Sequence, residues 1–225
     1  MTGIYDDAPQ PTYRLIPSQF PPIAVFDTVA IAADLQAVMD LVGWTNDRIV
    51  AHRVGRLPRP EWVYGRPNAS VVMASFLHVS PDGMRFNSSD LGAWYAAARL
   101  RTAVAEVAHH LRREASARGL TGQTRTYRAY AGRLAGRYLD IRGQGAIRPE
   151  FYDGMSYAAS QAFGEAVRAS DDDGLIYDSL RHVGGVNVVA YRPRNVLDVA
   201  QSDHFEIEVE VASSRIVARR LPAPT

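Results

Sequence analysis

The clearest structural signal in the sequence is an alternation of apolar and polar residues near the C-terminus. The apolar members are Phe205, Ile207, Val209 and Val211, and the polar members are His204, Glu206, Glu208 and Glu210. Because successive side chains of a β-strand point to opposite faces, this pattern predicts a strand with one buried and one solvated face. The chain is therefore expected to contain a sheet that other elements cover on one side.

Shorter apolar segments predict the rest of that sheet. Strands are predicted at Val71–Val79, at Gly92–Ala97, within Thr121–Gly143, at Leu175–Tyr177 and at Asn187–Tyr191. The first of these is a short, β-branched and nearly continuous apolar run, which is typical of a strand buried on both faces. It is followed by a turn signal at Pro81–Gly83, and the last two strands are expected to pair around a turn at His182–Gly185.

Helices are predicted where apolar residues recur at helical spacing. They extend from Asp27 or Thr28 to Val42, from Thr45 to Arg56, from Leu100 to the stop at Gly119, and over Ser156–Ala169. The first two are expected to form an accessory layer, a helical insertion at about residues 27–57. No repeat interrupts the chain, so we predict one α+β domain over residues 1–225, with mostly antiparallel sheets and flanking helices.

Composition removes several classes of chemistry. All 25 basic residues are arginine, since the chain contains no lysine, and it contains no cysteine. A phosphate-binding or Schiff-base lysine, a cysteine nucleophile, a Cys-ligated metal and a disulfide are therefore excluded. The net charge of +1 predicts no general attraction to nucleic acid or to an anionic membrane.

Targeting signals are also absent from the pattern. Residues 1–19 lack an apolar run behind a basic head, and no segment reaches the roughly 18 apolar residues of a membrane span. We therefore expect a cytoplasmic protein.

A metal site is not expected. The spacing of the histidines does not match a metal-binding motif; they are His52, His78, His109, His110, His182 and His204. His109 and His110 are adjacent and point about 100° apart on a helix, which favours surface or capping roles. The run Asp171–Asp173 before a glycine is typical of a solvated turn.

Two other constellations leave alternatives open. Ser156, in Gly154–Ala158, approximates a nucleophile elbow and would make the protein a serine hydrolase, although helix capping is the simpler interpretation. The Arg/Tyr-rich segment from Arg125 to Tyr138 could serve a non-enzymatic module that binds nucleic acid or a partner.

A set of short motifs, in order, carries a resemblance to a known family. They are Tyr13-Arg14-Leu15, Arg85-Phe86-Asn87, residues 92–97, 102–107 and 174–181, and the strand Val188 to Arg194. Together they resemble the RES domain over residues 12 to about 198. The chain departs from the family where it has Phe86 in place of Trp and Asp178 in place of Pro, and both changes keep the neighbouring Arg85 and Ser179.

The resemblance implies a fold like that of ADP-ribosyltransferases and a toxin that consumes NAD. It also implies an Xre-type helix-turn-helix antitoxin that covers the active site. NAD would be the substrate, phosphate or water would be the acceptor, and no cofactor would be needed. The alternative is a protein mono-ADP-ribosyltransferase that uses the same site. The sequence leaves a homodimer open and predicts no membrane or direct nucleic-acid partner.

The resemblance also assigns the site residues. The catalytic set would be Arg85, Tyr95, Glu106 and Ser179, and the NAD-binding set would be Tyr13, Arg14, Asn87 and Arg181. Arginines suit the pyrophosphate because they are planar, charged and bidentate, and Glu106 would face the cation that develops on the ribose. Helical spacing places Glu106 off the apolar stripe, so we expect it at the rim of a pocket with Arg85 across from it.

Overall fold

A nine-stranded sheet organises the fold. The computed structural model describes residues 3–20, 24, 26–29, 34, 53, 55–154 and 156–222. The strands are β1 (Tyr5–Asp6), β2 (Thr12–Pro17), β3 (Trp94–Ala97), β4 (Gly122–Leu134), β5 (Tyr138–Asp140), β6 (Gly174–Asp178), β7 (Val186–Ala190), β8 (Val196–Glu210) and β9 (Ile216–Leu221). Their order is β1-β5-β6-β7-β3-β2-β4-β8-β9. Only β5 and β6 pair in parallel among these neighbours, which confirms the predicted α+β class with a mostly antiparallel sheet.

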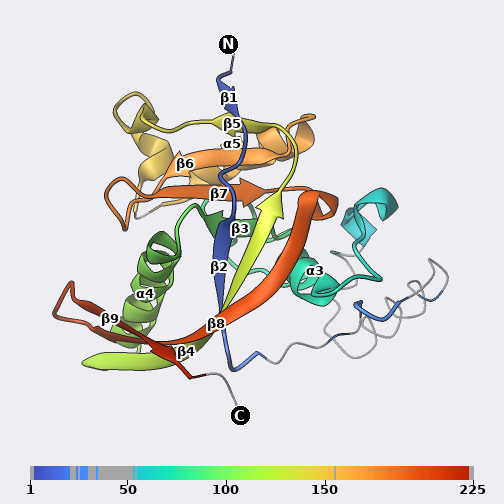
Figure 1. The fold of residues 1–225 in the computed structure, drawn as a ribbon. Coiled ribbons are helices and arrows are strands. Elements are labelled where there is room, and N and C mark those ends of the chain that lie inside the picture. Colours follow the sequence, from blue (N-terminus) through green and yellow to red (C-terminus); the bar gives the residue numbers. More distant parts are fainter. Residues whose placement is uncertain are drawn as a thin grey trace.

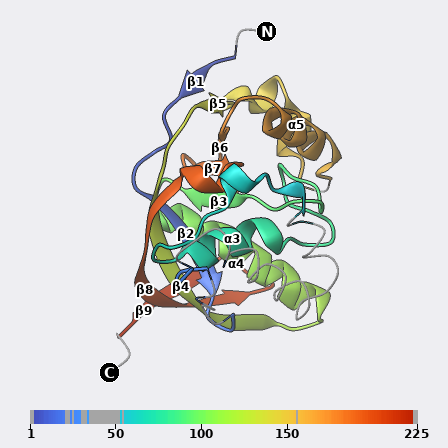
Figure 2. The same ribbon diagram turned by 90° about the vertical axis from the view of Figure 1, so that its right-hand side faces the viewer.

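Within the described part of the chain, three helices cover the two faces of this sheet: α3 (Ala69–Leu77), α4 (Leu100–Ala117) and α5 (Ala158–Ala169). Short 3-10 turns lie at η1 (Arg59–Glu61), η2 (Gln144–Ala146), η3 (Pro149–Tyr152) and η4 (Pro193–Asn195). Figure 1 shows α3 and α4 on opposite sides of β2, and Figure 2 shows β4 and β8 curving beneath α4. None of the helices among the described residues has the length and hydropathy to cross a membrane.

The buried side chains form three clusters that follow this layering. One packs α3 against Trp94, Val188 and other residues of one face. A second packs α4 against Leu15 and Phe205, and the third lies near α5 around Leu175 and Val189. Alternate residues of β3 serve both faces, because Trp94 belongs to the first cluster and Tyr95 packs against the third.

Most of the predicted elements are confirmed. The C-terminal alternation lies in β8, where Phe205, Ile207 and Val209 are buried. Residues 175–177 and 187–191 fall in or beside the antiparallel pair β6–β7. The helix predicted from Leu100 is α4, which ends just before Gly119; glycine adopts the φ of 68° at this position more readily than other residues do. Most of the helices predicted between residues 27 and 56, and with them the insertion at 27–57, lie outside the described residues.

The prediction of a strand at Val71–Val79 is wrong, because this segment forms α3. All of α3 except Ala74 is buried. A helix that is surrounded by protein has no solvated face, so its sequence carries no helical period and reads as a continuous apolar run. Periodicity alone therefore could not separate the two structures.

Asp27 also has a different role from the one predicted. We expected Asp27 or Thr28 to begin the helix that continues to Val42. Instead, the Asp27 carboxylate accepts hydrogen bonds from the backbone N–H groups of Asn68 and Ser70, each at 2.7 Å. It therefore satisfies free amides at the start of α3, from 41 residues away in the sequence.

One discontinuity in the sheet matters for function. β2 pairs with β4 along its whole length, from Thr12 to Pro17, but pairs with β3 only where Tyr13 faces Ala97. Beyond that point β2 and β3 separate. The Arg14 side chain spans part of the gap and donates from Nη1 to the carbonyl oxygen of Tyr95 at 3.0 Å.

Candidate active site

A cavity of about 250 Å³ lies where β2 and β3 separate. Its walls come from these two strands, from α4, from the end of α3 and the loop after it, from the residue before α5, and from the β6–β7 hairpin. Of the predicted site residues, the structure brings Tyr13, Arg14, Arg85, Tyr95, Glu106 and Arg181 to this cavity. Asn87 and Ser179 lie outside its lining.

Glu106 stands on the second turn of α4 and is half-buried. The hydroxyl of Ser179 and the side-chain amide of Asn187 both donate to its Oε1, each at 2.7 Å. Among the described residues no donor reaches Oε2. The carboxylate is therefore held in one orientation with one oxygen left for a ligand.

Ser179 supports Glu106 from behind. It is buried, and its Oγ accepts hydrogen bonds from the N–H groups of Arg181 and His182 at 3.1 Å while donating to Glu106. The hydroxyl thus ties the β6–β7 hairpin to α4. Any effect of Ser179 on a ligand in this geometry passes through Glu106 or Arg181.

Tyr95 and Asn87 hold each other in place. The Tyr95 hydroxyl donates to Asn87 Oδ1 at 2.8 Å and accepts from the N–H of Phe86 at 3.0 Å. Burial raises the pKa of Tyr95 above its ordinary value, so the phenol stays neutral. Asn87 is fully buried behind it. The pair therefore fixes the loop that carries Arg85, and Tyr95 is the member that meets the cavity.

The two predicted pyrophosphate arginines occupy different walls. Nη1 of Arg85 donates to the carbonyl oxygens of Phe151 (3.1 Å) and Asp153 (2.9 Å), and its guanidinium lies 4.7 Å from the ring centroid of Tyr157. Arg14 lies on the α3 face, 4.9 Å from the ring centroid of Trp94. No carboxylate lies within ion-pair distance of either arginine among the described residues.

Arg14 is therefore a half-buried cation that has no counter-charge among the described residues. Burial lowers its pKa to about 10, which still leaves the guanidinium charged at neutral pH. Its Nε is buried without a hydrogen-bond partner in the described part of the chain. Such an arrangement favours an anionic ligand, because a buried unpaired charge is costly until it is neutralised.

The sequence interpretation missed several polar residues of the cavity wall, among them Tyr177, Asn187, His109 and His110. Tyr177 and Asn187 face each other across β6 and β7, so their side chains share one face of the sheet. A lone asparagine inside an apolar strand was the available signal for Asn187. His109 and His110 both line the cavity; His110 is exposed, as expected of a surface residue, whereas His109 is half-buried.

The other candidate residues from the sequence make contacts within the fold, away from the cavity. Ser156 is exposed, lies outside the cavity lining and accepts a hydrogen bond from the N–H of Ala158 near the start of α5. Asp172 is buried and pairs with Arg137 at 2.7 Å, so the aspartate run is not the solvated turn we expected. No group of three metal-ligand side chains occurs within the described ranges.

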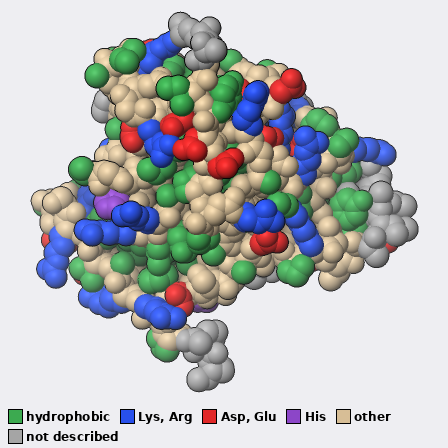
Figure 3. All heavy atoms as spheres, turned by 45° about the horizontal axis from the view of Figure 1, so that its top comes forward, with side chains coloured by type: hydrophobic (Ala, Val, Ile, Leu, Met, Phe, Trp, Pro, Cys, Tyr) green, Lys and Arg blue, Asp and Glu red, His purple; other side chains and the backbone are tan. Residues whose placement is uncertain are grey.

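The Arg/Tyr segment is likewise committed to the fold. Arg125 makes a bidentate pair with Glu114 at 2.7 and 2.9 Å, and Tyr127 and Tyr130 are buried. On the face drawn in Figure 3, basic and acidic side chains are interspersed rather than gathered into one basic field. Neither observation favours a nucleic-acid surface on this segment.

These features define a class: an α+β protein with a cavity at a break in its central sheet, lined by arginines, tyrosines and an anchored glutamate. The chain belongs to the RES domain family, whose model matches residues 51–210. The match begins after β2, so the assignment of Tyr13 and Arg14 to the site stays a prediction.

The proteins similar to this chain include the following two. The Sinorhizobium fredii protein "Uncharacterized protein y4oC" is 32% identical over 101 residues, which is 41% of this chain and 40% of that protein's length. A chain in the crystal structure of the M. tuberculosis MbcT-MbcA toxin-antitoxin complex has a TM-score of 0.50 and 12% identity, covering 92% of this chain and 88% of that one. The second likeness is one of fold.

Proposed function

We propose that this protein is the toxin of a toxin–antitoxin pair and cleaves the bond between nicotinamide and ribose in NAD. The observation that carries the proposal is the Glu106 carboxylate, which Ser179 and Asn187 anchor at the wall of a cavity. The cavity lining also contains Arg14, Arg85 and Arg181, none of which has a carboxylate within ion-pair distance among the described residues. Membership of the RES domain family supports this biological setting, as does the similarity in fold to a chain of a toxin–antitoxin complex.

The chemistry needs a fixed negative charge beside the ribose. When the C–N bond breaks, both electrons go to the nicotinamide nitrogen, which becomes neutral, and positive charge develops on the ribose carbon and ring oxygen. The free Oε2 of Glu106 would stabilise that charge, because a preorganised carboxylate needs no reorganisation at the moment of reaction. A phosphate or water oxygen then bonds to the carbon, and a water acceptor releases its proton to solvent.

The arginines would hold the other end of the substrate. A pyrophosphate suits Arg14 and Arg85, since guanidinium groups donate two parallel hydrogen bonds to phosphate oxygens. The cavity of about 250 Å³ is slightly smaller than the roughly 300–1,000 Å³ of usual ligand pockets. We therefore expect it to enclose the nicotinamide riboside end, with the adenosine towards the open side.

Neutralisation would be achieved by a partner that covers this cavity. We propose an antitoxin of the Xre helix-turn-helix type as that partner. Expression of the protein alone should lower cellular NAD and stop growth, and co-expression of the antitoxin should restore both. Growth arrest without NAD loss would contradict this assignment.

The biochemical test uses the purified full-length protein, NAD, and mass spectrometry of the products with and without phosphate. Nicotinamide release is expected, and Glu106→Gln or Arg85→Ala should lower its rate by about 100-fold or more while the circular dichroism spectrum is unchanged. Glu114→Gln is the matched control, because Glu114 lies on the same helix but pairs with Arg125 outside the cavity. Full activity of both site variants would refute the assignment.

The same experiment identifies the acceptor. ADP-ribose phosphate indicates phosphorolysis, free ADP-ribose indicates hydrolysis, and label from NAD on a protein side chain indicates ADP-ribosyl transfer.

A further inference from the structure

The β6–β7 hairpin lies along α4, and this contact gathers basic groups at one wall of the cavity. Ser179 bonds to Glu106, and one helical turn earlier Thr102 Oγ1 lies 2.8 Å from Nδ1 of His182. The turn of α4 that follows Glu106 carries His109 and His110, three and four residues on, which places them near the same face of the helix. Arg181 lies on the hairpin between the two anchored residues, and it lines the cavity together with both histidines.

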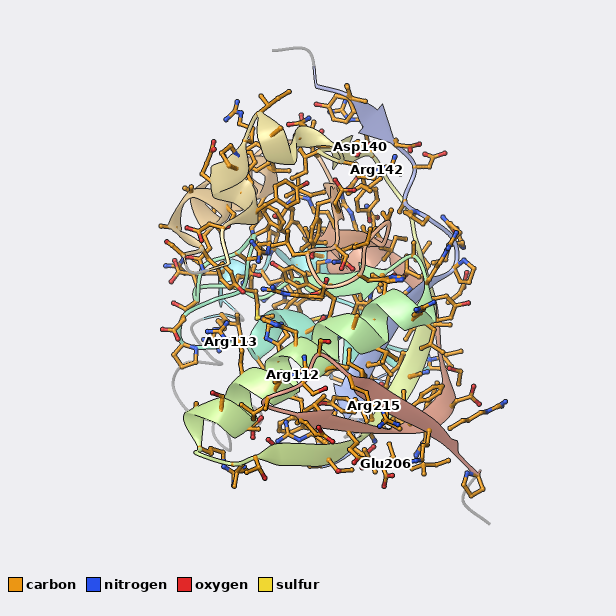
Figure 4. The ribbon with its side chains drawn as sticks, turned by 90° about the vertical axis from the view of Figure 1, so that its left-hand side faces the viewer. Arg112, Arg113, Asp140, Arg142, Glu206 and Arg215 are labelled. Carbon is orange, nitrogen blue, oxygen red and sulfur yellow. The ribbon has the colours of Figure 1, made fainter. Side chains whose placement is uncertain are left out.

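Arg181 gives this wall a positive charge. Among the described residues, neither Arg181 nor Arg113 has a carboxylate within ion-pair distance. Burial, and then the charges of Arg181, His110, Arg113 and Arg112, lower the pKa of His109 to about 4. Figure 4 shows Arg112 beside the turn that carries Arg215. Nη2 of Arg112 donates to the carbonyl oxygen of Arg215 at 3.0 Å, so the Arg112 side chain points towards β8 and β9 and away from the cavity.

The hydrogen-bonding capacity of this wall is also unused. Nε2 of His109 is buried and has no partner among the described residues. Two acidic residues line the cavity: Asp178, which accepts from the N–H of Gly143, and Glu106, whose Oε1 is already occupied by Ser179 and Asn187. The charge of Glu106 acts on His110, where it raises the pKa against the larger lowering effect of burial.

We propose that Arg181, His109 and His110 form a second anion subsite in the cavity, separate from Arg14 on the α3 face, and that it takes a phosphate group. The guanidinium supplies two parallel donors and each imidazole supplies one, which matches the several oxygens of a phosphate. The phosphate is either inorganic phosphate acting as acceptor or one phosphate of the dinucleotide. The role of this phosphate in catalysis rests on the proposed NAD cleavage, whereas the binding of phosphate to the subsite does not.

Binding is tested with inorganic phosphate and the full-length protein, by following the imidazole NMR signals of His109 and His110 across pH. Bound phosphate should raise the pKa of His109, because its negative charge offsets the surrounding arginines. Arg181→Gln should weaken phosphate binding about tenfold or more, in line with the loss of one charge-assisted contact. The matched control Arg118→Gln changes an exposed arginine at the end of α4 and should bind phosphate as the wild type does.

ADP-ribose distinguishes the two sources of the phosphate. If the subsite takes inorganic phosphate, phosphate and ADP-ribose bind together, and Arg181→Gln weakens phosphate binding more than it weakens ADP-ribose binding. If it takes the dinucleotide, ADP-ribose displaces phosphate and the variant weakens both. The subsite would be refuted if phosphate left the titration of His109 unchanged, or if Arg181→Gln bound phosphate as the wild type does. Phosphate binding without NAD cleavage would refute only the proposed reaction.

Discussion

At the scale of single residues, the site depends on polar groups that orient one another. Asn187 is almost completely buried in a strand that is otherwise apolar, and its amide donates to Glu106. A buried amide without such a partner would be destabilising, so the Glu106 carboxylate and the Asn187 amide stabilise each other. Asn187 is therefore a positioning residue for the candidate catalytic carboxylate.

Substitution of Asn187 should reveal this role through the pH profile. Asn187→Leu keeps a similar volume and removes one donor to a charged acceptor, which is worth about 1.5–3 kcal/mol, so the kcat of NAD cleavage should fall about 10–100-fold. Asn187→Asp places a second carboxylate beside Glu106 and should raise the pKa of one of them, which shifts the acidic limb of the pH–rate profile upwards. A wild-type profile in both variants would exclude a positioning role.

Acid should weaken the contact between α4 and β4. The hydrogen bonds from Arg125 hold the pKa of Glu114 below its ordinary value, so their contribution is present above about pH 4.3 and is lost as the pH falls through the lower folded pKa. Glu114→Gln should lower the free energy of unfolding at pH 7 by less than about 1 kcal/mol, since the pair is partly exposed. Urea unfolding of the wild type and the variant at pH 7 and pH 3 measures the difference in their free energies of unfolding, which should be smaller at pH 3. An equal difference at both pH values would show that the ion pair does not cause it.

At the scale of elements, α5 reaches the site by packing closely on the loop that carries Arg85. Gly164 faces the carbonyl group of Phe86, and a methyl group at this position would overlap its oxygen. The same oxygen accepts from the Tyr191 hydroxyl at 2.8 Å. The position of Arg85 thus depends on a helix residue that has no side chain.

Gly164→Ala should therefore displace this loop. The overlap is expected to cost about 1–3 kcal/mol of the free energy of unfolding and to raise the KM for NAD, because Arg85 and Tyr95 both move. Thermal unfolding and steady-state kinetics measure the two effects. Gly55→Ala is the control, since an added methyl group there meets no atom within 4 Å; it should leave the KM unchanged and should not lower the stability, because alanine favours a helix more than glycine does. Equal behaviour of the two variants would contradict the packing argument.

At the scale of the whole molecule, β2 joins two halves of the sheet. On one side of it lie β3, β7, β6, β5 and β1, and on the other lie β4, β8 and β9. The cavity exists because β2 follows β4 fully and β3 only at Tyr13. The segment matched by the family model begins at residue 51 and so omits the strand on which this geometry depends.

A fragment consisting of residues 51–210 should therefore fail to fold cooperatively. Without β2, the edges of β3 and β4 lose their hydrogen-bonded neighbour, and the buried Leu15 leaves the α4 cluster. Urea unfolding of the fragment should show no sigmoidal transition, in contrast to the full chain. A cooperative transition in the fragment, with near-native NMR dispersion, would show that β2 is dispensable.

The sequence by itself determined the elements whose signals are local. The strand at 204–211, the helix after Leu100 and the paired strands around 182–185 follow from periods of two or 3.6 residues, and the short motifs led to the family. The tertiary structure alone decided that 69–77 is helical, that β2 lies between β3 and β4, and that Asn187, His109 and His110 meet Glu106 at one cavity. These outcomes depend on which distant segments pack together, and a local pattern records only that a residue is buried, not what buries it.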